Sequence, residues 1–342
     1  MTYAQARLRL GICSVGWWVL IAGLALLSGV AGRLELSEFA VVYALASLPF
    51  DLLGGQLLPR LWGKARLNLV RWLWMYSRGV LVHLGIWTIS LGLTSLSYLH
   101  LGLPVTIGLF WLLSGAFFAY QLPLLGWLGV GLRRHTWGWE AEAVDPRFVG
   151  GLWGLPLPGR EEVVVPSQWL APDAPVGLAS TIERRRNLSL SGWRAAGLIL
   201  AIGFNSLVLI KALQWGGGQP VATACWATLL SFLGLLVLPS LSRPGVLAAD
   251  RFAPVDTPWG RWLEDRQEED PRRSLWIDRI FHPIPQWSIR QSQSGIHSKS
   301  GFVPWNLARY ALVHSSLCGS LLSRSVHCNC GRPELWFWPP GD

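Results

Sequence analysis

The chain has 342 residues, of which 51% are hydrophobic and only 14% are charged. An average soluble domain carries roughly a quarter charged residues, so this sequence has too little charge to cover a water-facing surface of its size. The deficit is concentrated in stretches of about 20 residues, the length that crosses a hydrocarbon core of about 30 Å. The composition therefore excludes an ordinary soluble domain and predicts a mostly α-helical, multi-pass membrane protein.

Six apolar stretches predict six transmembrane helices, with four before a charged, proline-rich interruption and two after it. The first and fourth stretches contain no charged residue, whereas the second contains Asp51 and the third contains His83. The fourth is longer than one crossing needs, which permits tilt or an interfacial end. The predicted spans are Gly11–Gly32, Phe39–Leu58, Gly79–Leu99, Pro104–Gly131, Ala195–Trp215 and Pro220–Pro239.

These spans divide the chain into four predicted parts. Residues 1–131 form an N-terminal membrane region with four helices, and residues 195–239 form a later pair of transmembrane helices. Residues 132–194 and 240–342 carry most of the charge and many prolines. We therefore expect these two parts to form a small cytoplasmic α+β portion.

Lysine and arginine in the short flanks indicate the orientation, because positively charged flanks stay in the cytoplasm. Such residues precede the first span, fill the loop after the second, and flank the fourth, fifth and sixth. The opposite connections hold Arg33, balanced by Glu35 and Glu38, and Lys211, which can snorkel to the interface. We expect both termini in the cytoplasm, in a cell membrane or the inner membrane of a Gram-negative cell. A cleaved signal peptide is the competing interpretation of the first span.

The net charge of +9 and the 22 tryptophans have a common interpretation at the membrane surface. Arginine and tryptophan alternate beside the spans, as in Arg60–Trp62 and Arg71–Trp74. Aromatic rings sit at headgroup depth, where cations meet anionic lipid. The predicted partner is the lipid bilayer, with membrane proteins or peptide segments as further candidates. No nucleic-acid partner is expected, because the sequence contains no recognition motif.

Two features mark the end of the chain. Asn306–Ser325 places several leucines and Tyr310 near one helical face, which predicts an amphipathic helix lying on the membrane or capping the soluble portion. The tail His327–Cys330 contains metal-capable ligands but lacks the second ligand pair of a closed zinc site. An ordinary tail is the preferred interpretation, and metal binding there is the alternative.

The charged parts contain a few predicted elements. Val163–Val165 lies between charged residues and Pro166, a pattern typical of an edge strand or a short strand. Pro175–Leu190 and Trp259–Arg273 have helical patterns, and the acidic and basic residues of the second are typical of a solvated face.

The order of these pieces resembles the membrane-embedded zinc metallopeptidases of the HtpX and CAAX-prenyl-protease type. In that family, spans lead to a short strand, a helix bearing HExxH, further spans, a helix bearing ExxxD whose Glu is the third zinc ligand, and a later His-Pro segment. The resemblance covers roughly the second half of the chain and implies a metallopeptidase-like cytoplasmic portion. The matching pieces are Val163–Val165, Ala179–Asn187, Ala248–Ala253 and Phe281–Pro283, with Arg290 beyond.

The zinc ligands that this resemblance implies are missing from the sequence. If Glu183 takes the general-base position, Ile182 and Arg186 take the two histidine positions, and neither side chain can bind zinc. Val246 stands where the third ligand belongs, while Asp250, normally behind the ligands, remains. Glu183 and Asp250 are therefore expected to be vestigial, and neither a metal nor another cofactor is expected.

Without zinc there is neither a Lewis acid nor an activated water. The resemblance together with the missing ligands therefore predicts a non-catalytic pseudopeptidase that acts through binding. It would serve as a scaffold, as a regulator of a related active protease, or as a handler of unfolded membrane segments.

Two other functions stay open. An active zinc-dependent endopeptidase would need atypical ligands such as His135, His282 or His327. Ionisable groups inside a membrane are functional candidates by default, so a small transporter could be built around Asp51 and His83.

The simpler interpretation of Asp51 is a buried polar contact with Arg60 or His83. Leu113-Ser114-Gly115 resembles the GxSG motif of intramembrane serine proteases but lacks its first glycine. A membrane serine without a placed histidine partner usually bonds to its own helix, and we expect this of Ser114.

Overall fold

The computed structural model describes residues 3–64, 67–136, 138–142, 151–153, 162–170, 193–252, 304, 306–326 and 329–337. The chain forms two compact units. The first unit comprises Met1–Phe117, Ile202–Gly234 and Ala311–Trp338, and the second comprises Phe118–Ala201, Leu235–Tyr310 and Pro339–Asp342.

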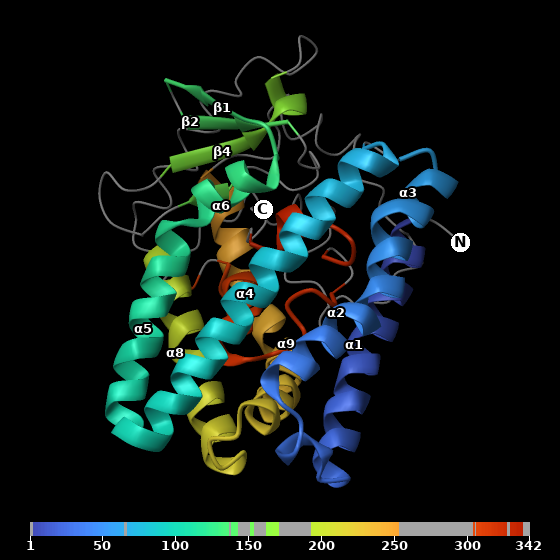
Figure 1. The fold of residues 1–342 in the computed structure, drawn as a ribbon. Coiled ribbons are helices and arrows are strands. Elements are labelled where there is room, and N and C mark those ends of the chain that lie inside the picture. The colour runs from blue at the N-terminus through green and yellow to red at the C-terminus, as the bar shows by residue number, and fades with distance from the viewer. Residues whose placement is uncertain are drawn as a thin grey trace. The chain divides into compact units, whose positions relative to one another are not determined.

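Long apolar helices dominate the described chain (Figure 1). Five of them are long and apolar enough to cross a membrane, and a sixth crossing is possible if the bent pair α5 and α6 acts as one span. The axes of that pair differ by 54°, so the long fourth stretch is a broken helix. The helices are α1 (Tyr3–Leu27), α2 (Leu36–Leu52), α3 (Leu58–Leu61), α4 (Leu69–Leu101), α5 (Leu103–Ala119), α6 (Gln121–Leu128), α8 (Trp193–Trp215) and α9 (Pro220–Phe252).

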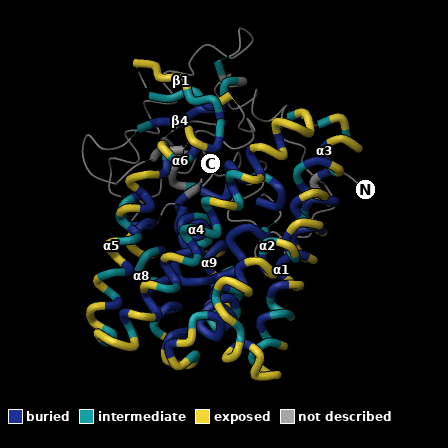
Figure 2. Tube along the Cα trace, viewed as in Figure 1, coloured by how far each residue is buried: buried dark blue, intermediate teal, exposed yellow. Residues whose placement is uncertain are grey.

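Exposed positions recur along these helices (Figure 2), and many of them are large apolar residues. Leu45 in α2, Leu81 in α4 and Leu112 in α5 are 64%, 68% and 71% exposed. So many exposed leucines along whole helices suit lipid, since lipid supplies the apolar contacts that water cannot. The prediction of a multi-pass membrane protein is confirmed by helix length and hydropathy.

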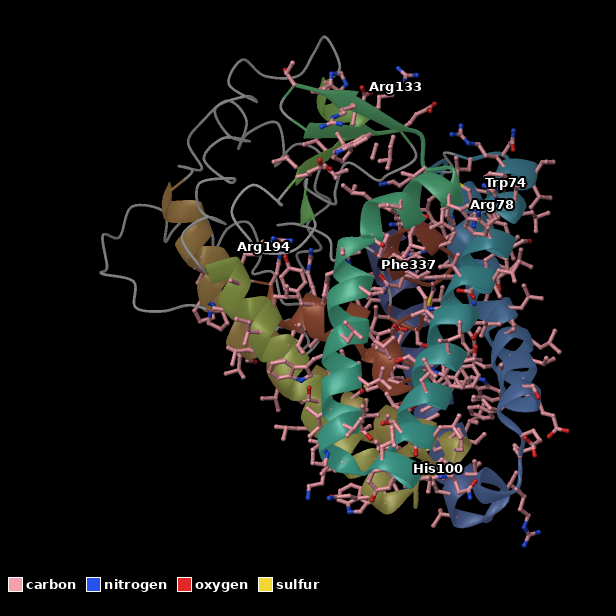
Figure 3. The ribbon with its side chains drawn as sticks, turned by 60° about the vertical axis from the view of Figure 1, so that its left-hand side comes forward. Trp74, Arg78, His100, Arg133, Arg194 and Phe337 are labelled. Carbon is pink, nitrogen blue, oxygen red and sulfur yellow. The ribbon has the colours of Figure 1, made fainter. Side chains whose placement is uncertain are left out.

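One end of α4 shows the predicted combination of arginine and tryptophan. The Arg78 guanidinium lies over the Trp74 ring at 3.6 Å from its centroid, while His100 marks the other end of the helix (Figure 3). Such stacking stabilises a cation beside an amphipathic ring.

A small sheet belongs to the second unit, with strand order β1-β2-β4-β3. The pairs β1–β2 and β3–β4 are antiparallel, and β2–β4 is parallel. The predicted strand Val163–Val165 is confirmed as part of the short strand β4, whereas the alternative of an edge position is wrong because β4 lies between β2 and β3. Pro166 is tolerated because it ends the strand. The strands are β1 (Leu132–His135), β2 (Gly138–Ala141), β3 (Gly151–Trp153) and β4 (Glu162–Pro166).

In the hairpin of β1 and β2, the side chains of His135 and Glu140 are in contact, with Nε2 of His135 2.9 Å from Oε2 of Glu140. Burial alone would raise the pKa of Glu140, but hydrogen bonding and the positive charges of His135 and Arg133 lower it below its ordinary value. Glu140 is therefore a charged partner for His135. The helices predicted at Pro175–Leu190 and Trp259–Arg273 lie outside the described residues.

The end of the chain differs from the expected amphipathic helix. Helix α13 (Leu307–His314) is shorter than predicted and is followed by the 3-10 turn η4 (Ser315–Cys318) and the short helix α14 (Pro333–Trp336). Gly319 ends the turn with a φ of 90°, a conformation that glycine adopts without strain. Almost all described residues from 306 to 337 are buried, so the expected solvent-exposed face is missing from this part.

Candidate functional site

The residues that carry the peptidase resemblance are mostly beyond what the structure describes. Glu183 and His282 lie outside the described residues, and Asp250 lies at the end of α9 with its side chain not described. His327 and Cys328 are also outside them, whereas Cys330 is buried and directs its Sγ to the Ser325 carbonyl at 3.2 Å. Among the described residues, no group of three His, Cys, Asp or Glu side chains could hold a metal ion.

A polar site of the first unit surrounds residues 311–326 and 329–337, which we call the C-terminal segment. This segment packs against α4, mainly through η4 and α14 (Figure 1). Phe337, near its end, lies beside α4 and within ring contact of His83 (Figure 3). A mostly non-helical segment thus lies inside a bundle of apolar helices.

Side chains from the spans donate hydrogen bonds to main-chain carbonyls of the C-terminal segment. From α4, Trp87 Nε1 donates to Gly319 O at 3.0 Å and Ser90 Oγ donates to Leu317 O at 2.7 Å. Four further donors act in the same way: Tyr43 to Leu321 O at 3.2 Å, Trp72 to Gly331 O at 2.8 Å, Asn205 to Ala311 O at 2.9 Å and Arg7 to Cys330 O at 3.3 Å.

Two main-chain N–H groups of the segment are also satisfied by the spans. Leu321 N donates to Thr228 Oγ1 of α9 at 3.1 Å, and Gly331 N donates to Asp51 Oδ1 of α2 at 2.8 Å. Irregular backbone at membrane depth persists only where protein groups replace water as hydrogen-bonding partners. The spans supply those partners here, so side chains of the spans satisfy backbone groups of the C-terminal segment.

Glycines let the segment approach the spans closely. After Pro49, α2 continues as a π-helical turn, Leu53–Leu57, that contains Gly54 and Gly55. A Cβ on Gly54 would overlap the main chain of Cys330, and one on Gly55 would overlap Gly331 O and the Trp72 ring. π-helical turns are frequent at functional sites, and this one opens the face of α2 to the segment.

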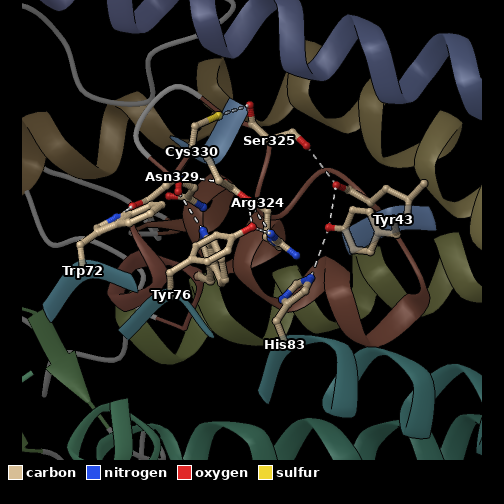
Figure 4. A network of polar contacts seen from close by, with 12 residues as sticks. Tyr43, Trp72, Tyr76, His83, Arg324, Ser325, Asn329 and Cys330 are labelled. Atoms are coloured by element: carbon tan, nitrogen blue, oxygen red, sulfur yellow. Dashed lines mark hydrogen bonds and ion pairs between the residues drawn. The ribbon is translucent and has the colours of Figure 1, made fainter. Parts of the chain in front are cut away.

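An ion pair lies in the centre of the contact. Arg324 Nη2 of the segment lies 2.5 Å from Asp51 Oδ2, and their side chains are only 1% and 2% exposed (Figure 4). The Tyr76 hydroxyl donates to the same carboxylate oxygen at 3.2 Å. The Arg324 guanidinium also lies over the rings of Trp336 and Tyr43, at 4.1 Å and 5.3 Å from their centroids. One charged group of the segment is therefore neutralised and enclosed.

The predicted partners of Asp51 were wrong. Arg324, rather than Arg60 or His83, forms its ion pair, while His83 Nε2 shares a 3.3 Å hydrogen bond with the Tyr43 hydroxyl. Both Asp51 oxygens already accept hydrogen bonds, an arrangement that disfavours an ion path through this carboxylate. Lys211 is exposed, as a snorkelling residue should be, and its Nζ lies 3.4 Å from Gln214 Oε1.

A second polar cluster surrounds Ser114, for which the sequence suggested no histidine partner. Ser114 Oγ donates to Phe110 O at 2.6 Å, as expected for a serine bonded to its own helix, but it also lies 2.7 Å from His314 Nε2. Asn205 Nδ2 lies 3.0 Å from His314 Nδ1 and, by donating to Ala311 O, presents its N–H side to that ring.

The geometry of these contacts favours one set of proton positions. With the Asn205 amide donating to Nδ1, the His314 proton belongs on Nε2, where it is donated to Ser114. A histidine that donates to a serine cannot accept the proton of that serine, so the cluster does not activate Ser114 as a nucleophile. It holds α13 and η4 against α5 and α8 within the first unit.

No protein-family model, curated protein or solved structure matches the chain. The general class of the protein therefore follows from the length and hydropathy of its helices. The protein is a multi-pass membrane protein that contacts the lipid bilayer.

Proposed function

We propose that this protein is a non-catalytic, membrane-embedded binding protein whose spans hold an irregular polypeptide segment. Its own C-terminal segment occupies the site. The observation that carries the proposal is the set of six main-chain carbonyls that accept hydrogen bonds from buried side chains of the spans. Contacts to carbonyls are independent of the side chain at each position, so such a site suits segments of differing sequence.

This binding role agrees with the pseudopeptidase hypothesis. Ile182, Arg186 and Val246 stand where the resemblance to zinc metallopeptidases implies ligands, which supports binding without hydrolysis. A membrane protein that retains polypeptide segments without cleaving them could act as a scaffold, as a regulator of a related protease, or as a handler of unfolded membrane segments.

The test uses the full chain with a site-specific protease sequence inserted between Ser294 and Gly295. After purification in detergent and cleavage, we expect the C-terminal fragment to co-elute with the rest of the protein on size exclusion. A fluorescent peptide of residues 306–337, added in excess, should then enter the complex and displace the fragment. Uptake of the labelled peptide reports that the site accepts a segment that is not covalently attached.

Two outcomes would contradict the proposal. Loss of the fragment on cleavage would show that the spans do not hold the segment. Retention of the fragment with no uptake of the peptide at equilibrium would show a fixed structural core instead of a binding site. The uncleaved chain, which should exclude the labelled peptide because its site is occupied, is the matched control.

A further inference from the structure

The C-terminal segment contains two described arginines that the first unit treats differently. Arg332 is only partly buried and donates to the Tyr3 hydroxyl at 3.0 Å. Arg324 is almost fully buried, paired with Asp51, and enclosed by the rings of Trp336 and Tyr43. Arg324 therefore presents its charge to a carboxylate that has been removed from water.

We propose that the spans select the bound segment by one arginine, and that Asp51 is the residue that pairs with this arginine. This inference rests on the proposed polypeptide-binding function and names the class of segment that the site prefers. The occupant is the protein's own C-terminal segment, which places Arg324 opposite Asp51. The main-chain contacts hold any segment, whereas the Asp51 carboxylate distinguishes among segments.

The selection depends mainly on the free-energy cost of binding a segment that has no arginine opposite Asp51. A segment with a neutral residue opposite Asp51 would leave a buried carboxylate without a counter-charge, which is far more costly than losing one exposed ion pair. Tyr76 and Gly331 N would still donate to Asp51, but neither carries a charge. A segment with an acidic residue there would face direct repulsion.

The geometry also favours arginine over lysine. A planar guanidinium can pair with a carboxylate through one edge while its face lies over aromatic rings, and an ammonium cannot do both. Arg324 Nε and Nη1 have no hydrogen-bond partner in the described part of the chain. The two ring contacts, the contact with Asp51 and a 3.5 Å contact between Nη2 and the Tyr76 hydroxyl therefore define how the guanidinium is held.

The experiment compares unlabelled peptides of residues 306–337 as competitors of the labelled wild-type peptide, on the cleaved full chain. We expect Arg324→Gln to weaken competition by at least about 100-fold, the lower end of what breaking a buried pair costs. Arg324→Lys should lie between the glutamine variant and the wild type. Arg332→Gln, which removes a hydrogen bond to the Tyr3 hydroxyl but leaves the Asp51 contact in place, should weaken competition less than Arg324→Gln does.

A variant of the cleaved chain tests whether Asp51 is responsible for the selection. In a cleaved chain carrying Asp51→Asn, the wild-type and Arg324→Gln peptides should compete within about threefold of each other. On the cleaved chain that retains Asp51, equal competition by these two peptides would overturn the proposed selection for arginine and would leave the binding function intact. Failure of even the wild-type peptide to compete would instead reject the binding function. The peptide variants leave the receptor unchanged, so the first comparison stands even if Asp51→Asn does not fold.

Discussion

At the scale of single residues, the notable feature is a fully buried pair of opposite charges. Burying a charge costs several kcal/mol, and the attraction within a pair often repays little more than that cost. Removing one partner is a different matter, since it leaves the other charge buried and alone. The pair of Asp51 and Arg324 is therefore better suited to fixing register than to adding stability.

This view predicts the outcome of a double-mutant cycle in detergent. Asp51→Asn and Arg324→Gln should each lower the free energy of unfolding by about 3–5 kcal/mol. The double variant should be less destabilised than the sum of the two, because neither charge is then left alone. Chemical denaturation followed by tryptophan fluorescence gives the four values. Strict additivity would show that the two side chains do not interact.

Lys211→Gln serves as a control for charge removal. Lys211 is exposed, and substitutions at such positions usually change stability by no more than about 0.5 kcal/mol. A loss as large as that of Asp51→Asn would show that the assay responds to charge in general.

At the scale of elements, five of the six predicted spans are helices long and apolar enough to cross a membrane, whereas the C-terminal segment could not be predicted from the sequence. Uncharged stretches of bilayer length identify spans without any knowledge of their neighbours. Strand β4 was likewise predicted from its valine run, although not its interior place, since strand order depends on pairing with β2 and β3.

The C-terminal segment was misjudged for a physical reason. Its leucines recur at helical spacing, but small residues such as Ser316 and Gly319 occupy the remaining positions. A face of small residues can be buried as readily as one of leucines. The stretch predicted to be a surface helix is therefore buried within the first unit. The partner of Asp51 lies 273 residues away in the sequence, and no local pattern links the two.

The close approach of α2 to the segment predicts a contrast between two glycines. Gly55→Ala places a methyl group against Gly331 O and the Trp72 ring, so it should displace the segment and lower stability by more than about 2 kcal/mol. Gly85→Ala, in α4, meets nothing within 4 Å and should be neutral or stabilising by up to about 1 kcal/mol. Thermal unfolding of both variants measures the difference. Equal behaviour would argue against close contact at Gly55.

At the scale of the whole molecule, the number of crossings decides the topology. The five long helices give an odd number, whereas counting the bent pair α5 and α6 as a span gives an even number. From the distribution of lysine and arginine we expect the even number, which would put the N-terminus and the region after α9 on the same, cytoplasmic side.

Reporter fusions test this topology. A reporter at the N-terminus and one inserted after Phe252, beyond α9, should both indicate the cytoplasm. Opposite compartments would mean that α5 and α6 do not complete a crossing. A reporter placed before Trp193 should also be cytoplasmic if the pair crosses.

Hydrogen bonds to its main chain hold the C-terminal segment inside the helical bundle. Hydrogen–deuterium exchange of the full protein in detergent, read by mass spectrometry, measures this directly, because amides in buried, hydrogen-bonded parts exchange slowly. Peptides covering residues 311–326 and 329–337 should be protected as strongly as those from α4. Exchange of these peptides within seconds, as in an exposed tail, would contradict the account.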